Sequence, residues 1–199
     1  MNNNNIPNKN KIAWWKFLLP FSVQLLIILA IPSQSLYTYA FGKTVTIQTI
    51  PVDPYDLIRG YSQTLRYDVL SNWNDLKKLP GGENLEQGAT FYVTLQAPKS
   101  LEQKPPIPWT PIAVSNEKPD NLTENQIVLA GNNMDYRGAV YGLETYYMPE
   151  EQREKINQEI RELQRQDNGK IPFVVEVKID SRGKAIPLSL WISDNKYQF

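Results

Sequence analysis

The chain has 199 residues with 21 basic and 21 acidic side chains, and it contains neither cysteine nor histidine. These absences exclude thiol nucleophiles, disulfides, cysteine-bearing zinc sites and histidine-based triads, so an enzyme would depend on carboxylates, Lys, Ser or Tyr. The balanced charge, and the lack of a basic run beyond the N-terminal tail, argue against nucleic acid as a partner. We expect a non-enzymatic protein without a cofactor, a metal or catalytic residues.

The longest apolar run lies near the N-terminus. It follows an Asn-rich tail over residues 1–12, which we predict to be disordered and cytoplasmic. The run itself, FLLPFSVQLLIILAI at residues 17–31, belongs to a segment about long enough to cross a bilayer core of roughly 30 Å. We predict a transmembrane anchor over residues 13–36, with Pro20 in the first helical turn, where a missing N–H costs little.

The residues that flank the run predict its orientation. Three lysines precede it and one follows it closely, so the positive-inside bias places the tail in the cytoplasm and the rest of the chain outside. Trp side chains before the run and Tyr side chains after it suit the two headgroup zones. These flanking residues are Lys9, Lys11, Lys16, Lys43, Trp14, Trp15, Tyr37 and Tyr39.

Two questions about the anchor stay open at the level of sequence. A cleavable signal peptide is the alternative to an anchor, with Thr38-Tyr39-Ala40 as the cleavage site, although the run is long for such a peptide and bulky Tyr residues flank the site. Gln24 is the strongly polar side chain in the middle of the span. It could form a hydrogen bond with a partner helix, or it could be tolerated without one.

Residues 37–199 alternate between apolar and polar side chains, which predicts one extracytoplasmic β-rich domain. The first strand is predicted over residues 43–50, with Val45 and Ile47 facing inward. Residues 98–111 hold five prolines and cannot form a central strand. A short helix is expected within residues 73–78. Further strands are predicted over residues 64–70, 91–95, 112–115, 126–131 and 138–147.

A longer helix and a hairpin are predicted toward the C-terminus. The helix spans residues 149–166, with a thin apolar stripe of Ile156, Ile160 and Leu163 that would pack on a sheet. The hairpin joins residues 173–179 to residues 184–192 through a turn at residues 180–183. The predicted fold class is therefore mainly β: an N-terminal transmembrane helix followed by an antiparallel β-sandwich or barrel-like domain with one inserted α-helix.

The stretch DPYDLIRGYSQTLRY at residues 53–67 resembles the motif of the GDYXXLXY proteins, which are membrane-anchored bacterial proteins. The pattern of that family continues with Asp and Tyr after the glycine, whereas this chain has Tyr61 and Ser62, which look like a cyanobacterial variant. The N-terminal anchor, the Tyr141–Glu144 strand and the closing hairpin extend the resemblance over most of the chain. The residues that match the motif are Asp53, Pro54, Asp56, Leu57, Arg59, Gly60, Leu65 and Tyr67.

The resemblance implies a single-pass envelope protein without an established activity, placed beside a multi-span membrane protein. It implies an inner-membrane or thylakoid location, with a cytoplasmic N-terminus and a periplasmic or lumenal domain. The bilayer and an integral-membrane protein are thus the expected partners. The leading hypothesis is a non-enzymatic binding or accessory protein. The alternatives are an envelope hydrolase that uses Ser/Lys or paired carboxylates, and a small-ligand carrier.

The motif itself supports two interpretations. In the first it is structural: Asp53 and Asp56 bond backbone groups or Arg59, Gly60 supplies an unusual backbone conformation, and Tyr67 lies on a core strand. In the second these polar side chains form a ligand or partner site, since short polar loops beside rigid strands often carry function.

Two further sets of polar residues are weaker candidates for catalytic residues. Ser181–Lys184 fits S-x-x-K and Ser193–Asn195 fits S-D-N, two patterns of penicillin-binding enzymes, but no K-T-G follows and the first lies in a predicted turn. The carboxylates Asp135 and Glu144 are isolated in the sequence, so we expect them to be solvated or salt-bridged rather than catalytic.

Overall fold

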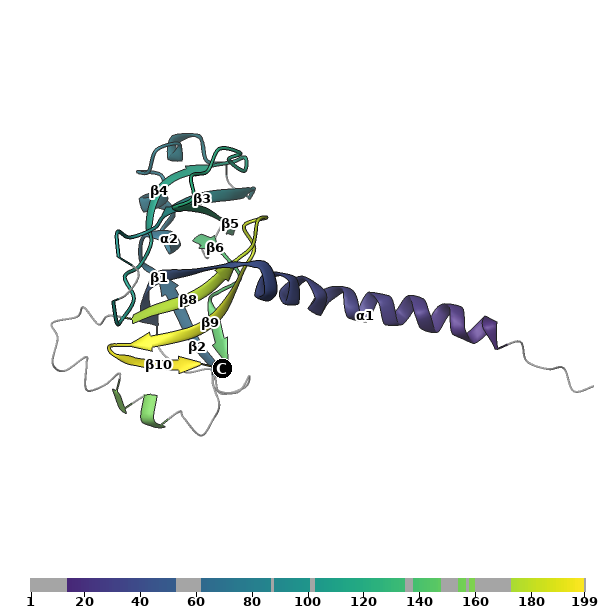
Figure 1. Ribbon diagram of the computed structural model, residues 1–199. Coiled ribbons are helices and arrows are strands. Elements are labelled where there is room, and N and C mark those ends of the chain that lie inside the picture. The colour runs from purple at the N-terminus through teal and green to yellow at the C-terminus, as the bar shows by residue number, and fades with distance from the viewer. Residues whose placement is uncertain are drawn as a thin grey trace, which may run out of the picture. The chain divides into compact units, whose positions relative to one another are not determined.

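The computed structural model describes residues 14–52, 62–86, 88–100, 103–134, 138–147, 154–156, 158–159 and 173–198. The chain forms two compact units, and the boundary between them lies between Leu36 and Tyr37. Its elements are one long helix followed by β-strands with a few short helices (Figure 1). The predicted fold class, an apolar N-terminal helix before a mainly antiparallel β domain, is confirmed.

The first helix, α1 (Trp15–Phe41), is long and apolar enough to cross a membrane. Its large apolar side chains are exposed, and Thr38 is its one buried residue. Pro20 is the sixth residue of α1, so the prediction that it lies in the first turn is wrong. It removes a hydrogen bond to the preceding turn, a loss that spanning helices tolerate.

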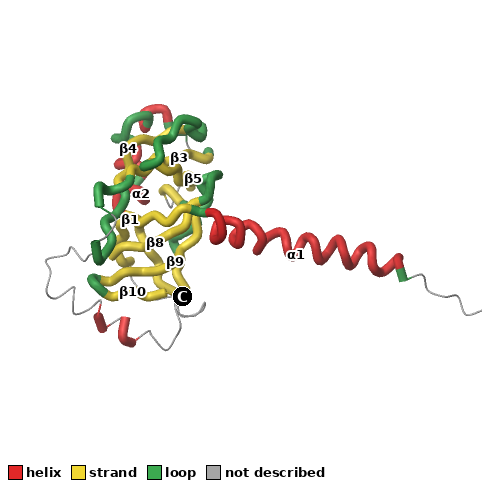
Figure 2. The backbone as a smooth tube through the Cα atoms, viewed as in Figure 1, coloured by secondary structure: helices red, strands yellow, loops and turns green. Residues whose placement is uncertain are grey.

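Six antiparallel strands form the larger sheet (Figure 2). Its order is β10-β9-β8-β1-β2-β7, and the pairing of β1 with β8 places Val45 opposite Val177 and Ile47 opposite Val175, all four buried. The inward orientation predicted for Val45 and Ile47 is therefore confirmed. The strands are β1 (Lys43–Val52), β2 (Ser62–Tyr67), β7 (Thr145–Tyr147), β8 (Phe173–Ile179), β9 (Ala185–Ile192) and β10 (Asn195–Gln198).

Four antiparallel strands form the second sheet, in the order β4-β3-β5-β6. The predicted alternation in β3 is confirmed, since Phe91, Val93 and Leu95 are each at most 1% exposed. Of the Pro-rich segment at residues 98–111, the described residues before Thr110 form no strand, and Thr110 and Pro111 begin β4 at the edge of the sheet, which agrees with the prediction that this segment is not a central strand. The strands are β3 (Thr90–Gln96), β4 (Thr110–Ser115), β5 (Gln126–Met134) and β6 (Gly138–Val140).

Both sheets contribute to one hydrophobic core. Backbone hydrogen bonds connect them: Ala130 N–H donates to the Gly183 carbonyl at 2.9 Å. Trp109 N–H donates to the Thr46 carbonyl at 2.8 Å. This bond uses an edge position of β1 that precedes the pairing of β1 with β2, which begins at Thr49. The short helices are α2 (Asp68–Ser71), α3 (Trp73–Leu76) and the 3₁₀ turn η1 (Gly82–Asn84).

Two predicted strands differ from those in the structure. The strand predicted over residues 64–70 ends at Tyr67, because the Ser71 hydroxyl accepts a hydrogen bond from the Tyr67 N–H at 2.8 Å and the chain turns into α2. The strand predicted over residues 138–147 is broken into β6 and β7, which belong to different sheets. Gly142 lies between them with φ of 76°, a conformation that a continuous strand does not allow.

The C-terminal region contains one strand that the sequence did not predict, β10, paired with β9. The predicted hairpin is present as β8 and β9. Of the helix predicted over residues 149–166, the structure describes residues 154–156 and 158–159, which are helical, and Ile156 is fully buried. Ile160 and Leu163 lie outside the described residues.

Candidate functional site

Most of the predicted motif lies outside the described residues. This holds for Asp53, Pro54, Asp56, Leu57, Arg59 and Gly60, so the proposed bonds among them stay predictions. Leu65 pairs with Pro51 across β2 and β1. Tyr67 is the motif residue whose side-chain contacts the structure describes.

Tyr67 is a core residue with a satisfied hydroxyl group. Its side chain is 1% exposed, and its hydroxyl donates to the Leu143 carbonyl at 2.6 Å. Leu143 lies between β6 and β7, where the chain passes from one sheet to the other. The last residue of the motif therefore fixes this crossing point through one buried hydrogen bond.

A second tyrosine, Tyr141, bonds the same region from the other side. Its ring meets Tyr67 edge-on at 6.4 Å between centroids, and its hydroxyl donates to the Leu70 carbonyl at 2.9 Å. Burial, reinforced by the nearby Glu144 charge, raises the pKa of Tyr141 well above its ordinary value, so the phenol stays protonated as a donor. The ring of Phe91 lies 5.8 Å away and extends the aromatic cluster into β3.

Glu144 has a role that the sequence reasoning missed. We expected a solvated or salt-bridged carboxylate, whereas its Oε1 accepts a hydrogen bond from the Tyr141 N–H at 2.5 Å. The carboxylate thus closes the turn around Gly142. The spacing of three residues from Tyr141, across a glycine, is the sequence signal that could have indicated this turn.

Asp180, in the turn between β8 and β9, accepts five hydrogen bonds, and its side chain is 0% exposed. Its Oδ2 accepts from Arg182 Nη2 at 2.6 Å and Nε at 3.0 Å, and from the Thr38 hydroxyl at 2.9 Å. Its Oδ1 accepts from the backbone N–H groups of Arg182 at 2.9 Å and Lys184 at 3.1 Å. Burial alone would raise the pKa of Asp180, but these hydrogen bonds outweigh it and lower the pKa.

Contacts at this turn hold the end of α1 against the β8–β9 hairpin. Thr38 is 1% exposed, and the Lys178 ammonium donates to the carbonyl of Tyr39. Arg182 lies over the ring of Tyr37, 4.9 Å from its centroid. Sequence reasoning predicted the turn but not these contacts, since Thr38 and Asp180 are 142 residues apart.

A Ser–Glu–Lys group lies on the paired strands β8, β9 and β10. The Ser189 hydroxyl donates to Glu176, and Lys196 Nζ is 2.5 Å from the same carboxylate oxygen. Burial tends to raise the pKa of Glu176, but hydrogen bonds from Lys196 and Ser189 lower it. Because Ser189 is 0% exposed and its proton is committed to Glu176, this group has the features of a structural cross-strand pair.

The two patterns of penicillin-binding enzymes do not form one site. Ser181–Lys184 lies in the turn before β9, and Ser193–Asn195 begins in the turn after it. The eight residues of β9 separate them, which at about 3.3 Å per residue is roughly 25 Å. Within the described part of the chain, no group of three Asp or Glu side chains is placed to hold a metal ion.

A last polar contact joins the helical residues 158–159 to β10. Glu159 accepts hydrogen bonds from Asn195 Nδ2 at 2.5 Å and from the Tyr197 hydroxyl. Burial first, and then this carboxylate, raise the pKa of Tyr197 far above its ordinary value.

A family model described as GDYXXLXY protein matches residues 24–190, from the middle of α1 to β9. No curated protein and no solved structure matches the chain.

Proposed function

The chain belongs to the GDYXXLXY family, and from that premise we propose that it is a single-pass, membrane-anchored envelope protein that acts by binding another membrane protein, without catalysis. The observation that carries this proposal is α1. Its 27 residues are long and apolar enough to cross a bilayer, and its large apolar side chains have no cover within the described part of the chain.

The orientation follows from charge. Lys9, Lys11 and Lys16 precede the span, whereas Lys43 alone follows it closely, so the N-terminus is cytoplasmic and the β domain is periplasmic or lumenal. The family resemblance supports the inner membrane or a thylakoid membrane as the location.

The described polar clusters are engaged within the fold and give catalysis no support. Tyr67 and Tyr141 donate to backbone carbonyls, and Asp180 accepts from Thr38, Arg182 and backbone N–H groups of its own turn. The hydrolase alternative relied on Ser/Lys or paired carboxylates. The Ser–Glu–Lys group on β8, β9 and β10 has a buried serine that is bonded to its carboxylate, so this group gives that alternative no support.

The first test concerns anchoring and orientation. We expect the full-length protein to stay with membranes after alkaline extraction, because α1 is in the bilayer. A C-terminal tag should be digested when protease is added to spheroplasts or to exposed lumenal faces. A tag that is protected until the membrane is opened would contradict the orientation. A soluble mature chain that begins near Phe41 would show cleavage instead of anchoring.

The second test concerns the partner and uses Gln24, the polar side chain in the middle of the span. In hydrocarbon an amide gains from a hydrogen bond to another helix, worth about 1 kcal/mol. We therefore expect Gln24→Leu to lower several-fold the amount of a membrane protein that co-purifies in mild detergent. Quantitative mass spectrometry of the captured material measures this.

The matched control is Gln34→Leu, the same change ten residues further along α1, toward its interfacial end. It should leave capture unchanged. Equal capture by wild type and Gln24→Leu would show that the span does not recognise the partner, and capture of no membrane protein by any variant would contradict the proposed function.

A further inference from the structure

We propose that the end of α1 and the β8–β9 hairpin together form a binding surface for anionic phospholipid headgroups. This surface, here called the juxtamembrane collar, consists of Tyr37, Tyr39, Lys43, Lys178 and Arg182. The proposal rests on the proposed function, because it requires α1 to be in a membrane. It goes further by assigning a lipid class to specific residues of the β domain.

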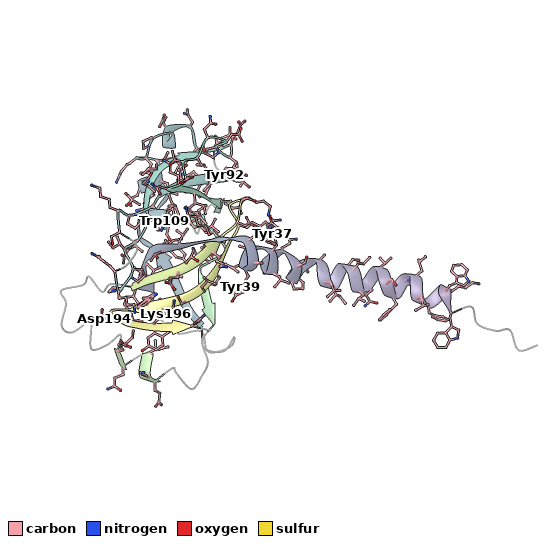
Figure 3. All side chains as sticks on the ribbon, viewed as in Figure 1. Tyr37, Tyr39, Tyr92, Trp109, Asp194 and Lys196 are labelled. Atoms are coloured by element: carbon pink, nitrogen blue, oxygen red, sulfur yellow. The ribbon has the colours of Figure 1, made fainter. Side chains whose placement is uncertain are left out.

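Chain connectivity places the collar next to the bilayer. Tyr37 is the first residue after the predicted span, and Lys43 follows two residues after α1 ends at Phe41. The aromatic side chains Tyr37, Tyr39 and Phe41 are 43%, 55% and 75% exposed. Exposed aromatic rings just beyond a span are typical of the headgroup zone. Figure 3 labels Tyr37 and Tyr39 at this end of α1.

Three cations lie near the junction between α1 and β1. Lys178 Nζ lies 5.0 Å from the centroid of the Tyr39 ring, and Arg182 lies over Tyr37. Lys43 Nζ donates to the Glu124 carbonyl at 2.5 Å and lies 5.1 Å from the Trp109 ring. The backbone pairing of β1 with β8 places Lys43 opposite Ile179 and Thr44 opposite Lys178, so the two lysines lie at the same end of this ladder with their side chains on opposite faces of the sheet.

The charge balance of these contacts favours an anion. Asp180 is paired with Arg182, so that carboxylate does not offset the two lysines. Lys43 and Lys178 contact carbonyl oxygens and aromatic rings, which leave the positive charge in place. An ammonium group has three donors, and one carbonyl uses one of them. Phosphate oxygens of a lipid headgroup fit the remaining donors.

Rigidity is the second argument. Lysines on a flexible tail lose side-chain and backbone entropy when they bind, whereas Lys43 and Lys178 lie on paired strands and their ammonium groups bond the Glu124 and Tyr39 carbonyls. The collar is therefore preorganised.

The experiment uses full-length protein reconstituted into phosphatidylcholine vesicles that contain a minor share of phosphatidylglycerol. Native mass spectrometry after extraction in mild detergent counts the lipids that stay bound. The test variant is Lys43→Gln with Lys178→Gln, since glutamine can still donate to the Glu124 and Tyr39 carbonyls but carries no charge. We expect wild type to prefer phosphatidylglycerol, and the variant to lose about tenfold or more of that preference.

Two further variants keep the result interpretable. Lys77→Gln with Lys118→Gln removes the same charge from exposed positions outside the collar and should keep the preference. Lys43→Arg with Lys178→Arg retains the charge and should also keep it. An unchanged preference in the Gln variant, or an equal loss in the Lys77/Lys118 variant, would overturn the collar. Flotation with pure phosphatidylcholine vesicles tests the anchor separately: a protein that floats without headgroup preference refutes only the collar, and one that does not float refutes both.

Discussion

Replacing Asp180 by alanine is expected to destabilise the β domain more than any other change of a single charged residue among those that the structure describes. The substitution removes the acceptor of the Thr38 hydroxyl, of two backbone N–H groups and of the Arg182 guanidinium. The half-exposed Arg182 can be solvated, but each buried donor left without its acceptor costs about 1–3 kcal/mol, so the loss of three such bonds should cost about 3–5 kcal/mol in total. The free energy of unfolding should fall by that amount, measured by denaturant titration of full-length protein in mild detergent with tryptophan fluorescence.

The matched control is Asp194→Ala, in the exposed turn between β9 and β10. It should change the free energy of unfolding by about 0.5 kcal/mol or less, as most exposed substitutions do. Asp180→Asn keeps an acceptor oxygen but loses the charge, so its cost should lie between the two. If Asp180→Ala were no more harmful than Asp194→Ala, the turn would not hold the end of α1 to the domain.

The pH dependence of stability provides a second measurement on these variants. The pKa of Asp180 is lowered by folding, so its stabilising contribution is complete above the unfolded-state value of about 3.9 and is lost as the pH falls through the lower folded-state value. Glu176 acts in the same direction. Wild type should therefore lose stability below about pH 4, and Asp180→Asn should show a shallower loss over the same range.

The strands that the sequence predicted well are those in which local pattern and burial agree. In β3, Phe91, Val93 and Leu95 alternate with polar residues and all three are buried, so a period of two was sufficient. The β8–β9 hairpin combines two apolar strands with a strong turn signal at residues 180–183. The apolar length of α1 was equally plain.

The features that the sequence did not predict depend on contacts between distant residues. Nothing local indicates that Thr38 bonds Asp180, because the two meet only when α1 ends against the hairpin. The break between β6 and β7 depends on Tyr67 and Tyr141 bonding carbonyls more than 70 residues away. β10 is short and polar at three of its four positions, so it forms because β9 offers a free edge.

The motif shows what residue spacing predicts and what depends on contacts in the folded chain. Its spacing identified the family, which the family model bears out over residues 24–190. The structural interpretation gains support at Tyr67, where burial and a bonded hydroxyl are observed. The interpretation of Asp56 and Arg59 as a stapled loop or a partner site stays a prediction.

Tyr67 therefore offers the sharpest test of what the motif does. Tyr67→Ala should lower the free energy of unfolding by about 3–5 kcal/mol, because it leaves a cavity where a fully buried aromatic side chain had been. Tyr67→Phe keeps the ring and leaves the Leu143 carbonyl without its donor, which should cost about 1–3 kcal/mol. Denaturant titration of the two variants beside wild type measures both values.

The same two variants separate a structural role from a binding role. If the end of the motif is structural, Tyr67→Phe should retain the co-purifying membrane protein at temperatures where the domain stays folded, since its surface is unchanged. Loss of that protein from a folded Tyr67→Phe variant would mean that the hydroxyl group acts in recognition, despite its burial. A Tyr67→Phe variant as stable as wild type would show instead that the hydrogen bond to the Leu143 carbonyl contributes nothing to the free energy of unfolding. Packing of the ring, including its contact with Tyr141, would then account for the contribution of this side chain.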